Sequence, residues 1–148
     1  MIPIKTIHYA VCSYYNIPID LPFKKGRKNQ VKYRQIIQYL SKKLNNQIPN
    51  GSHEFLSLEK IGRYYSEYTG IVYDHATVRH SVKKIQGFIE SYENYSMEIN
   101  NIIKIIKTLS VSKSLSFSEE KLIVINLVFL SENSTDLKSR LIKYVNNE

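Results

Sequence analysis

Apolar residues recur every three or four positions along most of this chain, which is the period of an amphipathic helix. The segments that show it are residues 4–15, 31–45, 57–68, 74–91 and 96–109. In residues 31–45 the apolar side chains form one stripe, while Arg34, Gln38 and Lys42 fall on another, so this helix is predicted to have a basic outer side. The pattern predicts an all-α fold without internal repeats.

Polar residues and prolines predict where these helices begin and end. Pro3 suits a helix start, and Pro18 should stop the first helix because the residue before a proline avoids the helical region. Ser57, Asp74 and Ser96 are predicted N-caps, since a side-chain oxygen at this position can accept a backbone N–H of the first turn.

Three segments between the helices are predicted as connections. Residues 17–23 are expected to form an extended connector, and residues 24–30 a basic loop, since they show no apolar period. Residues 45–56 contain Pro49 and the pair Asn50-Gly51, which are typical of a turn-rich loop.

Residues 57–91 are predicted as two helices around a short turn, which makes them a helix-turn-helix candidate. Gly62 in the first of these helices has no side chain and allows a close approach. The inner stripe of the second helix consists of Val78, Val82, Ile85 and Ile89. With that stripe buried, the residues presented outward are Asp74, His75, Ala76, Arg79, His80 and Lys83, the first two at the helix start.

The C-terminal part is predicted as a helical hairpin after a serine-rich hinge at residues 110–116. For residues 119–131 the Ile and Val content favours a strand, whereas the length and a capping box favour a helix. We predict a helix, because the chain offers no partner strand, and an amphipathic helix at residues 135–147. Residues 1–109 would then form one domain, and 110–148 an extension that packs on it or pairs with a protein partner or second copy.

Positive charge is concentrated in the N-terminal part of the chain. Residues 1–92 carry 14 Lys and Arg against 6 Asp and Glu, which accounts for the whole net charge of +8. Residues 24–43 contain eight basic residues and no acidic one. Such a basic stretch is the footprint expected for a phosphate-backbone partner, although a solvated surface would have the same composition.

Other classes of protein fit the composition poorly. The single cysteine, Cys12, excludes an internal disulfide and a cysteine zinc site, and it fits a reducing cytoplasm as a small buried hydrophobe. The longest apolar run, residues 122–130, is too short to span a bilayer. Neither a signal peptide nor a membrane association is therefore expected.

The segment YDHATVRH at residues 73–80 gathers reactive side chain types, but its spacing favours DNA reading over catalysis or metal binding. On a helix, His75 and His80 point about 140° apart, so they cannot share a metal ion. The chain contains no phosphate loop, nucleophile elbow or paired carboxylates, so no enzyme, metal or cofactor is predicted. In a helix-turn-helix, the first residues of the second helix reach base edges in the major groove.

Three blocks in order resemble the C-terminal DNA-binding domain, domain IV, of the bacterial replication initiator family DnaA. They are IKTIHYAVCSYYNIPIDL, RKNQVKYRQIIQYLSKKL and SLEKIGRYY followed by YDHATVRHSVKKI. The last block matches the family signature through Asp-His, Thr-Val, His and Lys-Ile at fixed offsets. The resemblance covers residues 1–109 and implies a helical bundle with a Trp-repressor-like helix-turn-helix that binds double-stranded DNA.

The resemblance also implies roles for individual residues. Base reading in the major groove would fall to Asp74, His75, Ala76 and Thr77, which lie on the family signature, and to the outward Arg79 and His80 beside them. The basic loop that enters the minor groove would use Lys25, Arg27 and Lys28, and contacts to the DNA backbone would come from Arg34, Gln35, Lys42 and Lys83.

Departures from the family pattern bear on the target and on the biological role. Tyr73 stands where the family usually has arginine, Ala76 stands for its first threonine, and the turn at residues 66–73 is longer than typical. No Walker motif is present, so we expect neither nucleotide binding nor ATPase activity. The expected protein regulates or assists replication or transcription in a bacterium or phage. The alternative is a protein-interaction or phage structural module with non-specific DNA affinity.

Overall fold

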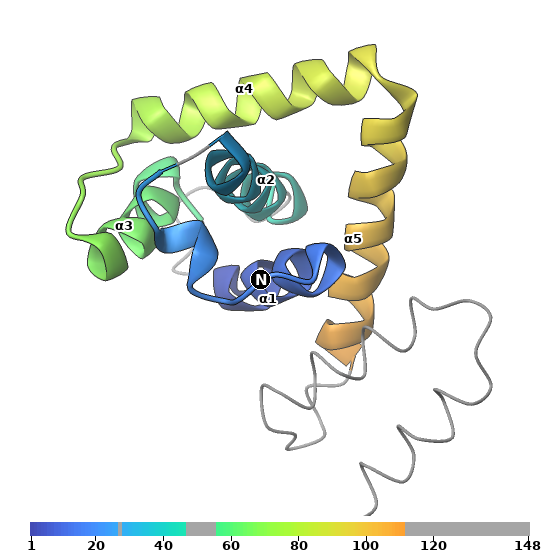
Figure 1. Ribbon diagram of the computed structural model, residues 1–148, viewed down its shortest axis with the longest axis horizontal. Coiled ribbons are helices and arrows are strands. Elements are labelled where there is room, and N and C mark those ends of the chain that lie inside the picture. Colours follow the sequence, from blue (N-terminus) through green and yellow to red (C-terminus); the bar gives the residue numbers. More distant parts are fainter. Residues whose placement is uncertain (27, 47–55, 112–148) are drawn as a thin grey trace, which may run out of the picture.

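The computed structural model describes residues 1–26, 28–46 and 56–111, and within these residues it consists of helices without strands (Figure 1). The elements are α1 (Ile4–Tyr15), η1 (Leu21–Phe23), α2 (Lys28–Leu44), α3 (Leu58–Thr69), α4 (His75–Ser91) and α5 (Glu93–Val111). The all-α prediction is thus confirmed. The loop predicted at 45–56 lies mostly outside the described residues, and so do the two helices predicted beyond residue 118.

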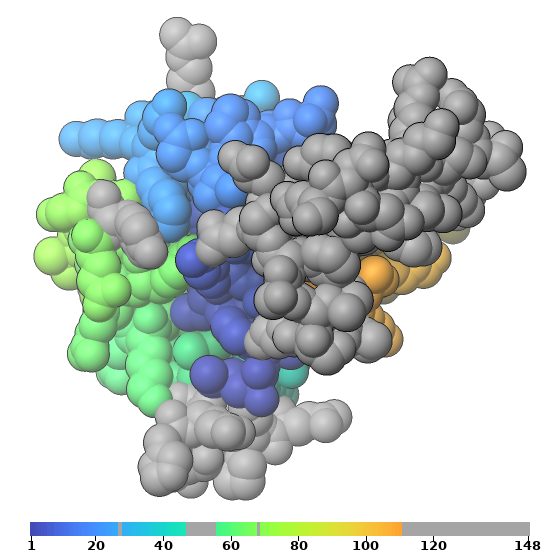
Figure 2. All heavy atoms as spheres, turned by 90° about the horizontal axis from the view of Figure 1, so that it is seen from below, coloured from blue at the N-terminus to red at the C-terminus, as the bar shows by residue number. Residues whose placement is uncertain are grey.

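Helix α2 forms the centre of the bundle, because α1 and α4 both pack against it (Figure 1). Helix α5 turns away from the end of α4 and returns along α1, while α3 packs under the start of α4. Seen from below in Figure 2, the N-terminal residues lie between α3 (green) and α5 (orange). The largest buried core side chains come from all five helices and include Ile7, Ile36, Ile37, Leu40, Ile61, Tyr65, Ile85, Ile99, Ile102 and Ile106.

The central place of α2 corrects one feature of the predicted helix. Gln38 was expected on a basic outer side, but its side chain is 1% exposed, and its neighbour Tyr39 is 2% exposed. Burial of seven consecutive residues, 35–41, follows because neighbouring helices cover α2 from more than one side. A helix that is covered on more than one side has no wide solvent-exposed face. The spacing of its apolar residues therefore underestimates how much of the helix is buried.

Two of the three predicted N-caps are confirmed. Ser57 accepts a hydrogen bond from the backbone N–H of Lys60, and Asp74 accepts one from that of Thr77. Ser96 does not cap α5, because that helix already begins at Glu93. The backbone N–H groups of Tyr95 and Ser96 instead bond to the carbonyl of Tyr92, so α5 starts one turn earlier than its apolar period indicated.

The connections around α2 also differ from the prediction. Helix α2 begins at Lys28, so part of the predicted basic loop is helical, and residues 21–23 form a short 3-10 turn rather than an extended connector. Helix α1 ends as predicted before Pro18: Asn16 adopts a left-handed conformation with φ 51°, and its N–H bonds back to the helix. Cys12 is buried, and burial raises the pKa of its thiol to about 12, which keeps it protonated.

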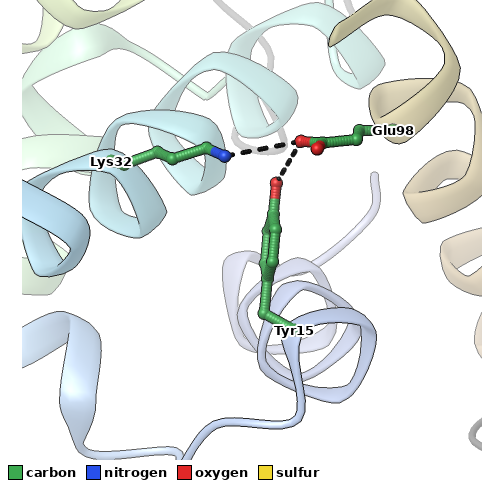
Figure 3. Close-up of polar contacts among 3 residues, drawn as sticks. All are labelled: Tyr15, Lys32 and Glu98. Carbon is green, nitrogen blue, oxygen red and sulfur yellow. Dashed lines mark hydrogen bonds and ion pairs between the residues drawn. The ribbon is translucent and has the colours of Figure 1, made fainter. Parts of the chain in front are cut away.

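A polar cluster ties α5 to α1 and α2 (Figure 3). The Tyr15 hydroxyl donates to Glu98 Oε2 at 2.8 Å, and Lys32 Nζ lies 3.5 Å from the same oxygen. The Lys32 ammonium also lies 5.1 Å from the ring centroid of Tyr15 and 5.2 Å from that of Tyr95. Burial, and then the bond to Glu98, raises the pKa of Tyr15, so its hydroxyl remains a donor. The cluster fixes the first turns of α2, directly after the basic loop.

Candidate nucleic-acid interface

The first turn of α4 is built around the cap at Asp74. Its Oδ1 accepts from the backbone N–H of Thr77 at 2.8 Å and from the Thr77 hydroxyl at 2.9 Å. The backbone bond, followed by the side-chain bond, holds the pKa of Asp74 below its ordinary value, so the carboxylate is charged at neutral pH. Asp74 therefore fixes the helix start and also places a negative oxygen at the exposed end of α4.

One long face of α4 is exposed, as the helical period predicted. Val78 and Ile85 are fully buried, while Val82 and Ile89 are partly buried against the core. All the residues expected to point outward are exposed, namely Asp74, His75, Ala76, Arg79, His80 and Lys83, and so is Thr77. Because positions three and four apart lie on the same side of a helix, Ala76, Arg79 and Lys83 form a continuous row.

A cleft of about 230 Å³ brings α4 together with the C-terminal end of α2 and the start of α3. It is lined by Lys42, Ser57, Leu58, Glu59, His75 and Arg79. Three of these, Lys42 from α2 and His75 and Arg79 from α4, were predicted to touch DNA, and they come from two separate stretches of the sequence. The cleft also lies at the N-termini of α3 and α4, where backbone N–H groups and the helix dipoles favour an anion such as phosphate.

The lining of this cleft contains residues that the sequence did not indicate. Ser57 was predicted only as a cap, and Leu58 was not singled out as a site residue. Glu59 adds a negative charge beside the predicted cationic residues, in the first turn of α3. Residues 57–59 reach the cleft because α3 packs under α4, a contact between elements that a helical period cannot reveal.

The basic loop presents its described lysines to solvent. Lys25 and Lys28 are exposed, whereas Lys24 is paired with Asp20 at 2.9 Å between Nζ and Oδ2. Arg27, the third predicted minor-groove residue, lies outside the described residues. Lys28 opens α2, so its position follows that of the helix rather than of a loose loop.

A second cavity of about 420 Å³ lies beside this loop, and it adds cations that were not predicted as a group. Its lining includes Lys28 and Lys32 from α2, Lys84 and Phe88 from α4, and Tyr95 from α5. Lys28 and Lys84 line the same cavity because the start of α2 lies against the far half of α4. This cavity therefore brings lysines of α2 and α4 to one place beside the basic loop.

Two residues expected at the DNA backbone, Gln35 and Arg34, are respectively buried and bound to other parts of the protein. Gln35 is only 8% exposed. The Arg34 guanidinium donates to the carbonyl of Pro22 at 3.3 Å and lies 4.9 Å from the ring centroid of Tyr73. Arg34 therefore links the segment before the basic loop to the turn before α4.

The turn between α3 and α4 is held by close backbone contacts. The Tyr73 N–H donates to Ser66 Oγ at 3.0 Å, and the Tyr73 ring packs 5.8 Å from that of Tyr65 between centroids. The close approach predicted at Gly62 is confirmed, but its partner is the turn: a Cβ at this position would collide with the Tyr73 carbonyl oxygen. Tyr73 thus anchors the turn against α3 and does not point outward with the reading residues.

The described residues contain no cluster of three or more His, Cys, Asp or Glu that could hold a metal ion. No helix in the same part of the chain is long and apolar enough to cross a membrane.

Comparison with known proteins identifies the helix-turn-helix. The family model described as "Bacterial dnaA protein helix-turn-helix" matches residues 4–85. Two proteins named chromosomal replication initiator protein DnaA, from Caldanaerobacter subterraneus subsp. tengcongensis and from a Thermoanaerobacter species, are each 36% identical over 107 residues. The DnaA of a Wolbachia from Brugia malayi is 32% identical over the same length.

These alignments cover 72% of this chain but only 20–21% of each relative, so the chain spans about a fifth of the length of the curated relatives it matches. No solved structure matches the fold.

Proposed function

Since this chain belongs to the family of bacterial DnaA helix-turn-helix domains, we propose that it binds double-stranded DNA and reads a preferred sequence with the first turns of α4. In DnaA this domain is the DNA-binding part and not a catalytic module. The observation that carries the proposal is the cleft where Lys42 from α2 meets His75 and Arg79 of α4. A phosphate held there would set the exposed face of α4 against the bases of the adjoining major groove.

The residues predicted from the sequence divide into groups by the DNA feature that we propose they contact. Asp74, His75, Ala76, Thr77, Arg79 and His80 would face base edges in the major groove. Lys25, Arg27 and Lys28 would follow the minor groove. Lys42 and Lys83 would contact phosphates, whereas Arg34 and Gln35 would support the interface from inside, given their internal contacts and burial.

The biological role that we propose is regulatory or accessory to replication, without ATPase activity, through occupation of sites related to those of the initiator. The rival function is a protein-interaction module that reuses the fold. Exposed Tyr92 and Met97, 60% and 58% accessible at the corner between α4 and α5, favour that rival. This rival function predicts that no duplex is preferred and that substitutions of the exposed α4 residues leave DNA affinity unchanged.

Selection of duplexes from a random pool by the purified full chain tests the proposal. Affinity for a selected duplex and for its scrambled version would then be measured by fluorescence anisotropy across a salt series. We expect tighter binding to the selected duplex, with the logarithm of affinity falling linearly against the logarithm of salt concentration. Equal affinity for both duplexes would refute sequence reading, and absence of binding at low salt would refute DNA binding.

Two variants separate base reading from phosphate contact. His75→Ala should cost about 1–3 kcal/mol on the selected duplex and little on the scrambled one. Lys42→Ala should weaken both duplexes alike and reduce the salt slope by about one. The assignments would be wrong if Lys42→Ala lowered the affinity for the selected duplex only and His75→Ala lowered the affinity for both duplexes alike.

A further inference from the structure

An exposed apolar pair, Ile71 and Val72, lies in the turn immediately before the cap of α4. Val72 is 82% exposed and Ile71 is 37% exposed, which makes Val72 the most exposed large hydrophobic residue of the described chain. Burying an exposed β-branched aliphatic side chain against an apolar group is favourable, so this pair can contribute to binding a ligand that carries such groups. The turn forms the outer edge of the molecule at the start of α4 (Figure 1).

Hydrogen bonds from two side chains of α3 fix this turn. Thr69 Oγ1 accepts the Ile71 N–H at 3.1 Å and donates to the Tyr65 carbonyl at 2.8 Å. Ser66 Oγ, which accepts the Tyr73 N–H, donates to the Gly62 carbonyl at 3.1 Å. The two residues that follow the left-handed Gly70, φ 68°, are therefore held outward on a rigid support rather than on a loose loop.

The direction of Tyr73 explains why Val72 faces solvent. The Tyr73 ring packs inward against Tyr65 and Arg34, and its carbonyl is pressed against Gly62. Val72 precedes this anchor and lies two residues before Asp74, so it adjoins the residues proposed to read bases. The longer turn thus adds an apolar surface beside His75 and Ala76.

We propose that Ile71 and Val72 contact the 5-methyl groups of thymines in the major groove and extend the reading surface beyond α4. This inference rests on the proposed DNA binding. The thymine methyl is the apolar group that base edges present in the major groove. Two side chains beside cationic residues are far too small for a stable protein interface, which needs about 800 Å² from each partner. A thymine-rich half-site would supply methyl groups for both side chains.

Replacement of each thymine of a selected duplex by deoxyuridine tests the contact, because it removes one methyl group and leaves base pairing intact. Wild-type protein should lose about fourfold in affinity at the contacted positions, the value expected for one buried methyl group. Val72→Ala should lose a similar factor on the thymine duplex and should no longer distinguish uracil from thymine there. Ile71→Ala should do the same at a neighbouring position.

Met97→Ala is the matched control, since Met97 is an exposed apolar residue on α5 and its loss should leave the thymine dependence unchanged. Ala76 also adjoins the major groove, and a methyl effect due to Ala76 would persist in Val72→Ala. If selection yields a preferred duplex but both turn variants keep the wild-type uracil profile, the thymine contact is wrong and sequence reading stands. If selection yields no preferred duplex, both proposals fail.

Discussion

Gly62→Ala is expected to destabilise the protein, although alanine is the better helix former. Gly62 lies inside α3, where a Cβ would collide with the Tyr73 carbonyl oxygen, lie 3.0 Å from the carbonyl carbon, and lie 3.5 Å from Val78 Cγ2. The obstructing atoms belong to the backbone and cannot rotate away. Their turn is also tied to Ser66 Oγ, so the turn and the start of α4 must move together.

The size of the effect follows from two opposing contributions. Alanine in place of glycine stabilises a helix interior by about 1 kcal/mol. Overpacking costs about 1–3 kcal/mol and more where backbone must shift, so a net loss of about 1–2 kcal/mol is expected. Gly87 in α4 is the matched control, because a Cβ there meets nothing within 4 Å. Gly87→Ala should therefore stabilise the protein by about 0.5–1 kcal/mol.

Urea denaturation and thermal melts of the full chain measure both variants. A change of 1 kcal/mol corresponds to roughly 4 °C in Tm for a domain of this size, so the two variants should differ by about 6–12 °C. At a temperature where both are folded, Gly62→Ala should also weaken DNA binding, since it displaces the start of α4. A Gly62→Ala protein as stable as wild type, or an equal loss in Gly87→Ala, would refute the steric explanation.

Three further predictions concern buried or capping polar groups. Asp74→Ala should lower the Tm at pH 7, whereas Asp74→Asn should preserve it. The bond from the Thr77 N–H lowers the pKa of Asp74 below 3.8. Thermal melts between pH 2 and 7 should therefore show the stabilisation by Asp74 in full above about pH 4 and its loss only below that pH. Burial lowers the pKa of His8 below 6.5, so the unfolded chain binds the proton at a higher pH than the folded chain does. Stability should therefore fall as the pH drops from 6.5, and His8→Gln should make the Tm less dependent on pH between pH 7 and 5. Tyr15→Phe removes the donor to Glu98 and should cost about 1 kcal/mol in urea denaturation, without changing the affinity ratio of selected and scrambled duplexes.

Much of the fold could be predicted from the sequence because each helix has its own apolar period and two of them, α3 and α4, begin at a capping side chain. Asp74 and Ser57 are local signals, since each bonds to a backbone N–H three residues ahead. No such signal marks the start of α2 at Lys28 or of α5 at Glu93, because the first turns of both helices carry polar residues. The burial of Gln38 depends on packing of α2 by neighbouring helices, which no single segment encodes.

The exposed face of α4 could be predicted for the same reason, whereas the environment of the residues on α2 could not. Lys42 lines the cleft with His75 only because the end of α2 lies under the start of α4. The family resemblance placed Arg34 and Gln35 at the DNA backbone, but here Gln35 is buried and Arg34 is held by Pro22 and Tyr73. These contacts join residues far apart in sequence, and the contact of Arg34 with the ring at position 73 needs an aromatic residue there.

Position 73 shows how one departure from the family pattern reorganises the proposed interface. The family usually has an arginine before Asp-His, where an outward cation could face DNA, but Tyr73 turns its ring inward onto Tyr65 and receives the Arg34 guanidinium. Arg34 also bonds to the Pro22 carbonyl, just before the basic loop. One internal side chain therefore connects the two proposed DNA-contacting elements, the loop and the start of α4. In the proposed interface, Tyr73 supplies no positive charge, whereas Ile71 and Val72 are exposed next to it. We therefore expect the preferred sequence to shift toward thymine beside the proposed contacts of His75.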